Sequence, residues 1–191
     1  MTDTANGTTT LGVLVGSLRR ESLNAALARA LPALAPGGTR IVPLPSIGDF
    51  PLYDADVQAR GFPAPVSRMA EAMRAVEGVV IVSPEYNYSI PGGLKNAIDW
   101  ISRLPDQPFA GKPIAIQSAS PGAIGGARMQ YHLRQTMVFL DALVLNRPEV
   151  MIGNAHVRID PAGDVITDAT TRDFVAKQLA AFVAFVRKNS S

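Results

Sequence analysis

Leu11-Gly12-Val13-Leu14-Val15-Gly16-Ser17 is the stretch that decides the fold of this chain. Its apolar residues run without a polar interruption, which is typical of a parallel strand covered on both faces by other elements. The run ends in Gly-Ser, and an apolar stripe of helical period follows between residues 22 and 34. A buried strand, a short turn and a helix form the first half of a βαβ unit, so we expect a parallel sheet.

The same alternation of apolar runs and helical patterns continues along the chain. We expect further strands at residues 40–44, 78–82, 112–117 and 142–145, and helices at 22–34, 66–76, 92–104, 126–140 and 168–188. Residues 45–65 suggest an irregular loop, and residues 150–166 have no clear assignment. Right-handed crossovers restrict the topology. We therefore predict an α/β fold: a doubly wound, five-stranded parallel sheet in the order 2-1-3-4-5, with helices on both faces.

The length of 191 residues fits one domain, which we place at residues 11–191 behind a disordered extension of residues 1–10. The chain has no cysteine and two histidines. Disulfides, thiolate nucleophiles, cysteine-bound zinc and iron–sulfur clusters are therefore excluded. The formal net charge is +2, without a basic run that would indicate nucleic-acid binding. No apolar run reaches the ~18 residues of a membrane span, and no signal peptide is recognisable, so we expect a cytoplasmic protein.

The loop after the first strand contains the first candidate site. Ser17, Arg19, Ser22 and Asn24 lie where the strand turns into a helix. The free N–H groups at a helix N-terminus bind phosphate, and hydroxyls, an amide and a guanidinium add donors. The pattern matches neither the P-loop nor Gly-x-Gly-x-x-Gly. The alternative is that Ser22 only caps the helix and that Arg19 is solvated.

The second candidate site follows the third strand, at Pro84, Glu85, Tyr86, Asn87 and Tyr88. Two tyrosines and an asparagine in a proline-bounded loop make a flat, partly polar platform for a planar heteroaromatic ring. The alternative is a surface turn whose tyrosines fill a gap.

The third candidate site follows the fourth strand and contains Ser118 and Ser120. The carboxyl ends of neighbouring parallel strands meet at one edge of a sheet, so we expect the three loops to converge on one crevice. None of the loops contains a histidine, and the paired carboxylates or triads of hydrolysis are absent. We therefore predict no catalytic side chain and no metal site, and chemistry carried by a bound cofactor.

These residues resemble the NAD(P)H-dependent FMN reductase family, in particular its bacterial chromate and quinone reductase branch. The resemblance is carried by Gly16-Ser17-Leu18-Arg19 with Ser22 and Asn24, by Pro84-Glu85-Tyr86-Asn87-Tyr88, by residues 91–100, and by residues 125–128 and 131–135. It implies a flavodoxin-like fold that holds FMN non-covalently. Ser17, Arg19, Ser22 and Asn24 would bind the phosphate, Glu85 to Tyr88 would line the isoalloxazine, and Ser118 and Ser120 would close the site.

The resemblance also implies an activity. NAD(P)H would pass a hydride to the flavin, and a quinone, chromate or another small electron acceptor would then replace the nicotinamide in a ping-pong cycle. Two alternatives remain open, namely a flavodoxin-type electron carrier and a non-catalytic flavin-binding module. Such carriers tend to be acidic, which this chain is not. The sequence does not rank NADH against NADPH, and it does not identify the acceptor.

The helices at residues 92–104 and 126–140 suggest self-association. Met129, Leu133, Met137 and Leu140 share one stripe, whereas Ala127, Tyr131 and Val138 lie opposite, so the second helix is apolar on two sides. A second apolar face usually meets a partner. Trp100, on the flank of the first helix, either meets a partner or packs against a neighbouring helix of its own chain. The resemblance implies a homodimer or homotetramer with the FMN near the subunit boundary.

Overall fold

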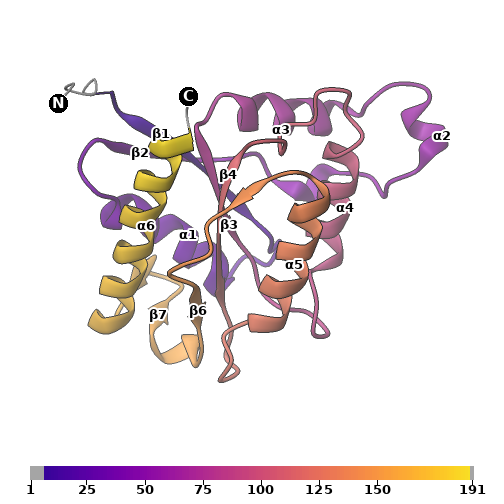
Figure 1. Ribbon diagram of the computed structural model, residues 1–191. Coiled ribbons are helices and arrows are strands. Elements are labelled where there is room, and N and C mark those ends of the chain that lie inside the picture. The colour runs from indigo at the N-terminus through magenta and orange to yellow at the C-terminus, as the bar shows by residue number, and fades with distance from the viewer. Residues whose placement is uncertain (1–6, 190–191) are drawn as a thin grey trace.

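A computed structural model describes residues 7–189 (Figure 1). Its main sheet is parallel, and the strands have the order β2-β1-β3-β4-β5. The strands are β1 (Thr9–Val15), β2 (Thr39–Pro43), β3 (Gly78–Val82), β4 (Pro113–Ala119) and β5 (Leu143–Val144). The predicted doubly wound sheet in the order 2-1-3-4-5 is therefore confirmed.

The fifth position of the sheet is built from two short strands. β5 pairs with the start of β4, and β6 (Val150–Ile152) pairs with its end. Residues 145–149 separate them and include the cis peptide bond between Arg147 and Pro148. Two buried glutamines reach this region, because Gln178 Nε2 donates to Pro148 O (2.7 Å) and Gln130 Nε2 donates to Val150 O (2.7 Å). These bonds satisfy carbonyl groups next to the break in the ladder.

The helices form a layer on each face of the sheet (Figure 1). α1 (Leu23–Leu34) and α6 (Ala169–Asn189) pack on one face, and α3 (Ala64–Arg74), α4 (Gly92–Ile101) and α5 (Ala127–Phe139) pack on the other. Each layer buries its own apolar cluster against the sheet. β3, which is buried along its whole length, contributes to both clusters. This is the expected environment of a central parallel strand.

Several helices and strands have other bounds in the structure than the sequence predicts. Strand β1 begins at Thr9, so Thr9 and Thr10 belong to the sheet and not to the predicted extension. Residues 1–6 of that extension lie outside the described residues. The predicted loop at 45–65 contains two short helices, η1 (Ile47–Asp49) and α2 (Ala55–Gln58). Residues 150–166, which had no assignment, form β6, the turn η2 (Ala155–Val157) and the hairpin of β7 (Ile159–Asp160) and β8 (Val165–Ile166).

Trp100 is fully buried within its own chain, so the alternative that it meets a partner is wrong. Its indole ring contacts the edge of the Tyr53 ring, with ring centroids 5.0 Å apart, and its Nε1 donates to Pro51 O at 2.9 Å. The Asn96 side chain also holds this segment, because it accepts from Tyr53 N and donates to Pro51 O, both at 2.8 Å. The long segment before α3, and not a neighbouring helix, therefore packs against this flank of α4.

Helix α5 has the two faces that its sequence predicts. Met129, Leu133 and Met137 are fully buried, and they form the stripe that packs on the sheet. On the other side, Val138 is 78% exposed and Phe139 is 85% exposed. Among residues 7–189, no helix is long and apolar enough to cross a membrane.

Candidate functional site

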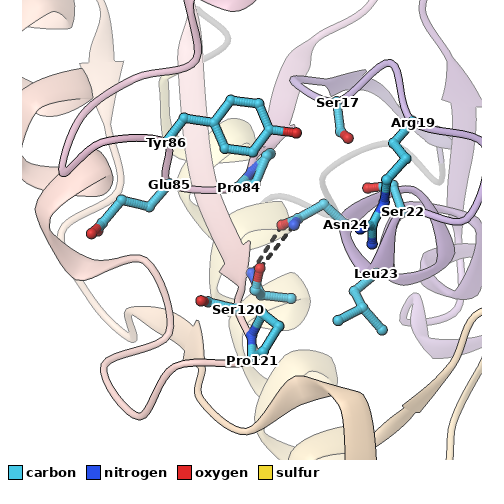
Figure 2. A pocket seen from close by; sticks show the side chains of 11 residues that line it. Ser17, Arg19, Ser22, Leu23, Asn24, Pro84, Glu85, Tyr86, Ser120 and Pro121 are labelled. Atoms are coloured by element: carbon cyan, nitrogen blue, oxygen red, sulfur yellow. Dashed lines mark hydrogen bonds between the residues drawn. The ribbon is translucent and has the colours of Figure 1, made fainter.

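The three predicted loops meet around one cavity of about 120 Å³ at the carboxyl ends of β1, β3 and β4. Figure 2 shows the side chains that line it. They come from the loop after β1 and the start of α1, from the loop after β3, and from the end of β4 and the loop after it. The lining residues are Ser17, Arg19, Ser22, Leu23, Asn24, Pro84, Glu85, Tyr86, Ala119, Ser120 and Pro121. The convergence expected from parallel strands is thus present.

The first loop brings donors to the N-terminus of α1. Ser22 is the N-cap residue, and its Oγ accepts from Ala25 N at 3.3 Å. Capping uses the hydroxyl as an acceptor, so its proton stays available for a ligand, and the two interpretations of Ser22 are compatible. Arg19 is exposed, and its Nη2 donates to Glu21 O at 2.9 Å. The remaining guanidinium donors are free to bind an anion.

Asn24 links the first and third loops. Its Nδ2 donates to Ala119 O at 2.8 Å, and its Oδ1 accepts from Ala119 N at 2.9 Å. Figure 2 shows both bonds at the centre of the cavity wall. The side chain is only 3% exposed. Nδ2 has a second hydrogen and the residue lines the cavity, so the predicted phosphate contact of Asn24 stays a prediction beside this linking role.

The second loop folds into a tight hairpin. Tyr86 N donates to Ser89 O at 3.1 Å, and Ser89 N donates to Tyr86 O at 2.9 Å. Between them, Asn87 and Tyr88 have φ values of 48° and 65°. Two central residues with positive φ define the turn that best fits a two-residue hairpin, although a tyrosine there is strained. The turn leaves the Tyr86 side chain 49% exposed and the Tyr88 side chain 65% exposed, and of the two only Tyr86 lines the cavity.

Glu85 ties the second loop to α5. Its Oε2 accepts from Met129 N, and its Oε1 lies near Arg128 Nη1, both at 3.2 Å. Gly126, the N-cap residue of α5, has no side chain to offer, so Glu85 caps this helix from another loop. Figure 2 shows that the carboxylate points away from the cavity. The Arg128 guanidinium also lies over the Tyr88 ring, 3.9 Å from its centroid.

The third loop contributes one serine to the cavity and not two. Ser120 lines the cavity, and its Oγ accepts from Gly122 N at 3.1 Å. Ser118 is fully buried, where it donates to Gly125 O and accepts from Gln130 Nε2 at 2.7 Å. The predicted direct contact of Ser118 with the cofactor is therefore corrected. The reason is that β4 extends to Ala119, beyond its predicted end at residue 117, so Ser118 lies inside the strand.

Eight of the eleven predicted residues line the cavity. The other three do not line it: Asn87 and Tyr88 form the turn of the hairpin, and Ser118 lies beneath the third loop. Sequence reasoning missed Leu23, Ala119 and Pro121, which also line the cavity. Each stands next to a predicted residue, so a rule that included the neighbours of the polar positions would have found them.

The cavity suits FMN chemically. The hydroxyls of Ser17 and Ser22, the Arg19 guanidinium and the N-terminus of α1 are the kinds of donor that bind a phosphate. The half-exposed ring of Tyr86 lines the same cavity, where it could pack against a planar heteroaromatic ring. Within residues 7–189, no group of three or more His, Cys, Asp or Glu side chains is placed to hold a metal ion.

The sheet order and the cavity at the carboxyl ends of its strands define a flavodoxin-like α/β protein. The solved structure of a flavodoxin from Pseudomonas aeruginosa confirms the fold, with a TM-score of 0.56 and 16% identity over 94% of this chain and 99% of the other. Residues 9–157 match the family described as NADPH-dependent FMN reductase, and the chain belongs to that family. It is therefore an oxidoreductase, and FMN and NAD(P)H are its cofactor and co-substrate.

Individual relatives agree with this assignment. The chain is 58% identical to a quinone reductase of Escherichia coli (strain K12), over 92% of this chain and 94% of that protein. It is 50% identical to an NAD(P)H-dependent FMN reductase of Pseudomonas aeruginosa, over 91% of this chain and 92% of that protein. A solved flavoenzyme NAD(P)H:(acceptor) oxidoreductase from Paracoccus denitrificans has a TM-score of 0.84 and 36% identity, over 95% of this chain and 98% of the other.

Proposed function

We propose that the protein transfers electrons from NAD(P)H to quinones and other small acceptors, chromate among them, through FMN bound at the three-loop cavity. The observation that carries this proposal is that the phosphate donors and the half-exposed Tyr86 ring line one cavity. A quinone is a flat, largely apolar ring, and it would pack on the flavin at this open rim. The names of the Escherichia coli relative and of a 41% identical 2-hydroxy-1,4-benzoquinone reductase from a Burkholderia species support quinones as the acceptor class.

The chain's own residues have separate tasks in this proposal. Ser17, Arg19 and Ser22 bind the phosphate, and Ser120 closes the cavity from the third loop. The hairpin of Tyr86, together with Asn87 and Tyr88, flanks the ring and leaves one side open. When bound, FMN supplies the hydride chemistry that links NAD(P)H to the acceptor. One open side would serve both substrates in turn, which is why we propose a ping-pong cycle.

An electron carrier is the second candidate, and the chain argues against it. Carriers of this fold tend to be acidic, whereas the formal net charge here is +2. The similarity to the flavodoxin structure also extends only to the fold, because the sequences are 16% identical. A non-catalytic flavin-binding module would need no exposed aromatic rim beside the phosphate loop.

The test uses the purified full chain. After loading with FMN, the protein should show a flavin spectrum that NADPH or NADH bleaches without oxygen and that a quinone restores. Initial rates at several quinone concentrations should give parallel lines in double-reciprocal plots, as a ping-pong cycle requires. A protein that FMN fails to reconstitute, or a loaded protein that neither nucleotide reduces, would contradict the proposal. Chromate, a flavin and a quinone as acceptors, compared by kcat/KM, would rank the substrates.

We also propose a homodimer or homotetramer that forms through the outer face of α5. The exposed Val138 and Phe139 support this face as a contact, and the buried Trp100 removes the flank of α4 from it. Replacing Phe139 with glutamate should raise the dissociation constant of the assembly in sedimentation experiments, and it should leave the melting temperature of the chain nearly unchanged. Sedimentation of the wild-type chain as a monomer would contradict this assembly. The cytoplasmic location expected from the sequence stays a prediction.

A further inference from the structure

A contact between the tyrosine hairpin and α5 is not explained by the cavity. Ser89 Oγ and His132 Nδ1 lie 2.9 Å apart, within hydrogen-bond distance. Ser89 closes the hairpin of Tyr86 and Tyr88, and the His132 side chain is exposed to solvent. His132 is one of two histidines in the chain, and its position in the sequence places it in none of the three loops. The fold therefore brings a histidine to the rim where the acceptor is proposed to bind.

Quinone reduction creates a need for such a group. A hydride and a proton together convert a quinone to a hydroquinone, and the proton must come from solvent or from a side chain. Histidine is the side chain whose ordinary pKa lets it both bind and release protons near neutral pH. A positioned general acid of this kind contributes typically 10²–10⁴-fold to a rate. A serine hydroxyl is both a donor and an acceptor, so it can pass a proton between an imidazole and a ligand.

We infer that His132 supplies, through the Ser89 hydroxyl, the proton that a quinone takes up at the tyrosine hairpin. This inference rests on the proposed function. The Ser89 O–H bond breaks as its proton moves to the quinone oxygen, and the Nδ1 proton of the imidazolium moves to Ser89 Oγ. The hydride, which NAD(P)H supplies, completes the hydroquinone, and the neutral imidazole then takes a proton from water. In the single chain the His132 side chain is exposed to solvent, which supplies that proton.

The charged side chains near His132 are paired with one another. The charged side chains of the 83–91 loop, α4 and α5 form three ion pairs, Glu85 with Arg128, Lys95 with Asp99, and Arg134 with Glu149. Arg128, one helical turn before His132, is thus neutralised by Glu85, and it also lies over the Tyr88 ring. The other titratable groups on these segments are tyrosines, which are neutral near pH 7. Each charged side chain described on these segments therefore has an ion-pair partner.

The experiment separates proton delivery from simple support of the hairpin. The FMN-loaded protein is reduced with one equivalent of NADPH without oxygen and then mixed with either 1,4-benzoquinone or ferricyanide, which takes electrons but no proton. His132→Asn keeps a nitrogen near the position of Nδ1 and does not titrate. With the quinone, this variant should reoxidise at least about tenfold more slowly and lose the dependence on pH between about 5 and 8. With ferricyanide, its rate should match that of the wild type.

Ser89→Ala should slow the quinone reaction in the same way, and His156→Asn, at the other histidine, should slow neither reaction. A readout without turnover comes from proton NMR of the imidazoles, where His132 should titrate over the same pH range as the quinone rate. Equal losses with both acceptors would show that His132 only supports the hairpin, and an unchanged quinone rate would show that water supplies the proton. Either result would overturn the inference. If the wild type reduces neither the quinone nor ferricyanide, the proposed function itself is wrong, and the inference with it.

Discussion

The first and third loops follow parallel strands at the same edge of the sheet, and both contain serines, yet those serines differ in role. In the first loop, Ser17 and Ser22 line the cavity. In the third loop, Ser120 lines it, but Ser118 is fully buried beneath the backbone of Gly125. A hydroxyl near the end of a strand therefore faces the cavity only where no second segment covers its side chain.

A second layer of backbone covers the third loop. Ser120 N donates to Ile152 O, and Ala155 N donates to Ser120 O, both at 3.0 Å, while Asn154 N donates to Gly122 O at 3.3 Å. The segment that follows β6 thus holds this loop along much of its length. In the first loop, the only side chain that binds another loop is that of Asn24, among the hydrogen bonds described for residues 16–24. The first loop is therefore the more open of the two, and variants in each loop should have different consequences.

Gly125→Ala should have the largest effect, because it breaks the support of the third loop. The residue has a φ of +62°, and a Cβ there would stand 2.5 Å from the Met151 carbonyl carbon. Left-handed strain and the clash with backbone should together cost about 3–5 kcal/mol of unfolding free energy, measurable by urea unfolding. Gly122→Ala is the matched control, since its Cβ would come no closer than 3.5 Å to Ser120 Oγ. Equal losses in both variants would show that the third loop is not held as described.

Asn24→Ala should have the second-largest effect on stability, because it removes the hydrogen bonds between the first and third loops. The change leaves the N–H and C=O of Ala119 without partners in a buried region, and it should cost about 2–4 kcal/mol of unfolding free energy. Asn24→Asp keeps the acceptor and loses the donor, so its loss should be intermediate. If Asn24→Ala weakened FMN binding and left the unfolding free energy unchanged, Asn24 would be a phosphate ligand after all.

Arg19→Ala should act on the ligand and not on the fold. Arg19 is exposed, and its described hydrogen bond goes to the nearby Glu21 carbonyl. Loss of a charge-assisted hydrogen bond to phosphate should weaken the free energy of FMN binding by about 1.5–3 kcal/mol. The dissociation constant, measured by fluorescence titration, should rise accordingly. The unfolding free energy of the apoprotein should not change. Arg20→Ala is the control, because Arg20 is exposed and does not line the cavity, and a similar loss there would point to general charge and not to a specific contact.

The paired variants Ser118→Ala and Ser120→Ala should show the smallest and most specific difference. Ser118→Ala leaves Gln130 Nε2 with one partner fewer and the Gly125 carbonyl without its donor, so it should cost about 1–2 kcal/mol of unfolding free energy. Ser120→Ala should leave stability nearly unchanged and weaken FMN binding by a smaller amount, about 0.5–1.5 kcal/mol. Calorimetry of both apoproteins and FMN titration would compare them. The reverse pattern would place Ser118 in the site and Ser120 outside it.

Much of the fold was predictable because its signals are local. The buried strands at residues 11–15 and 78–82 lie where the apolar runs predict them, and Ser22 begins α1 as its capping chemistry predicts. The interrupted fifth position was not predictable, because β5 has two residues and β6 has three, which is too short for a periodic pattern. The burial of Trp100 could not be predicted from the sequence either, since the segment that covers it contains little regular structure.

The sequence by itself determined the alternation of the main strands and helices, and it determined that any redox step must use a borrowed cofactor, because the chain has no cysteine. The tertiary structure alone decided which polar side chains face the cavity. Asn24 finds its partner at Ala119, 95 residues away, and Glu85 caps α5 across 44 residues. His132 likewise reaches Ser89 only because α5 packs beside the hairpin. A polar side chain binds the partner that the fold brings within about 3 Å, and that distance is set by packing between segments far apart in the chain.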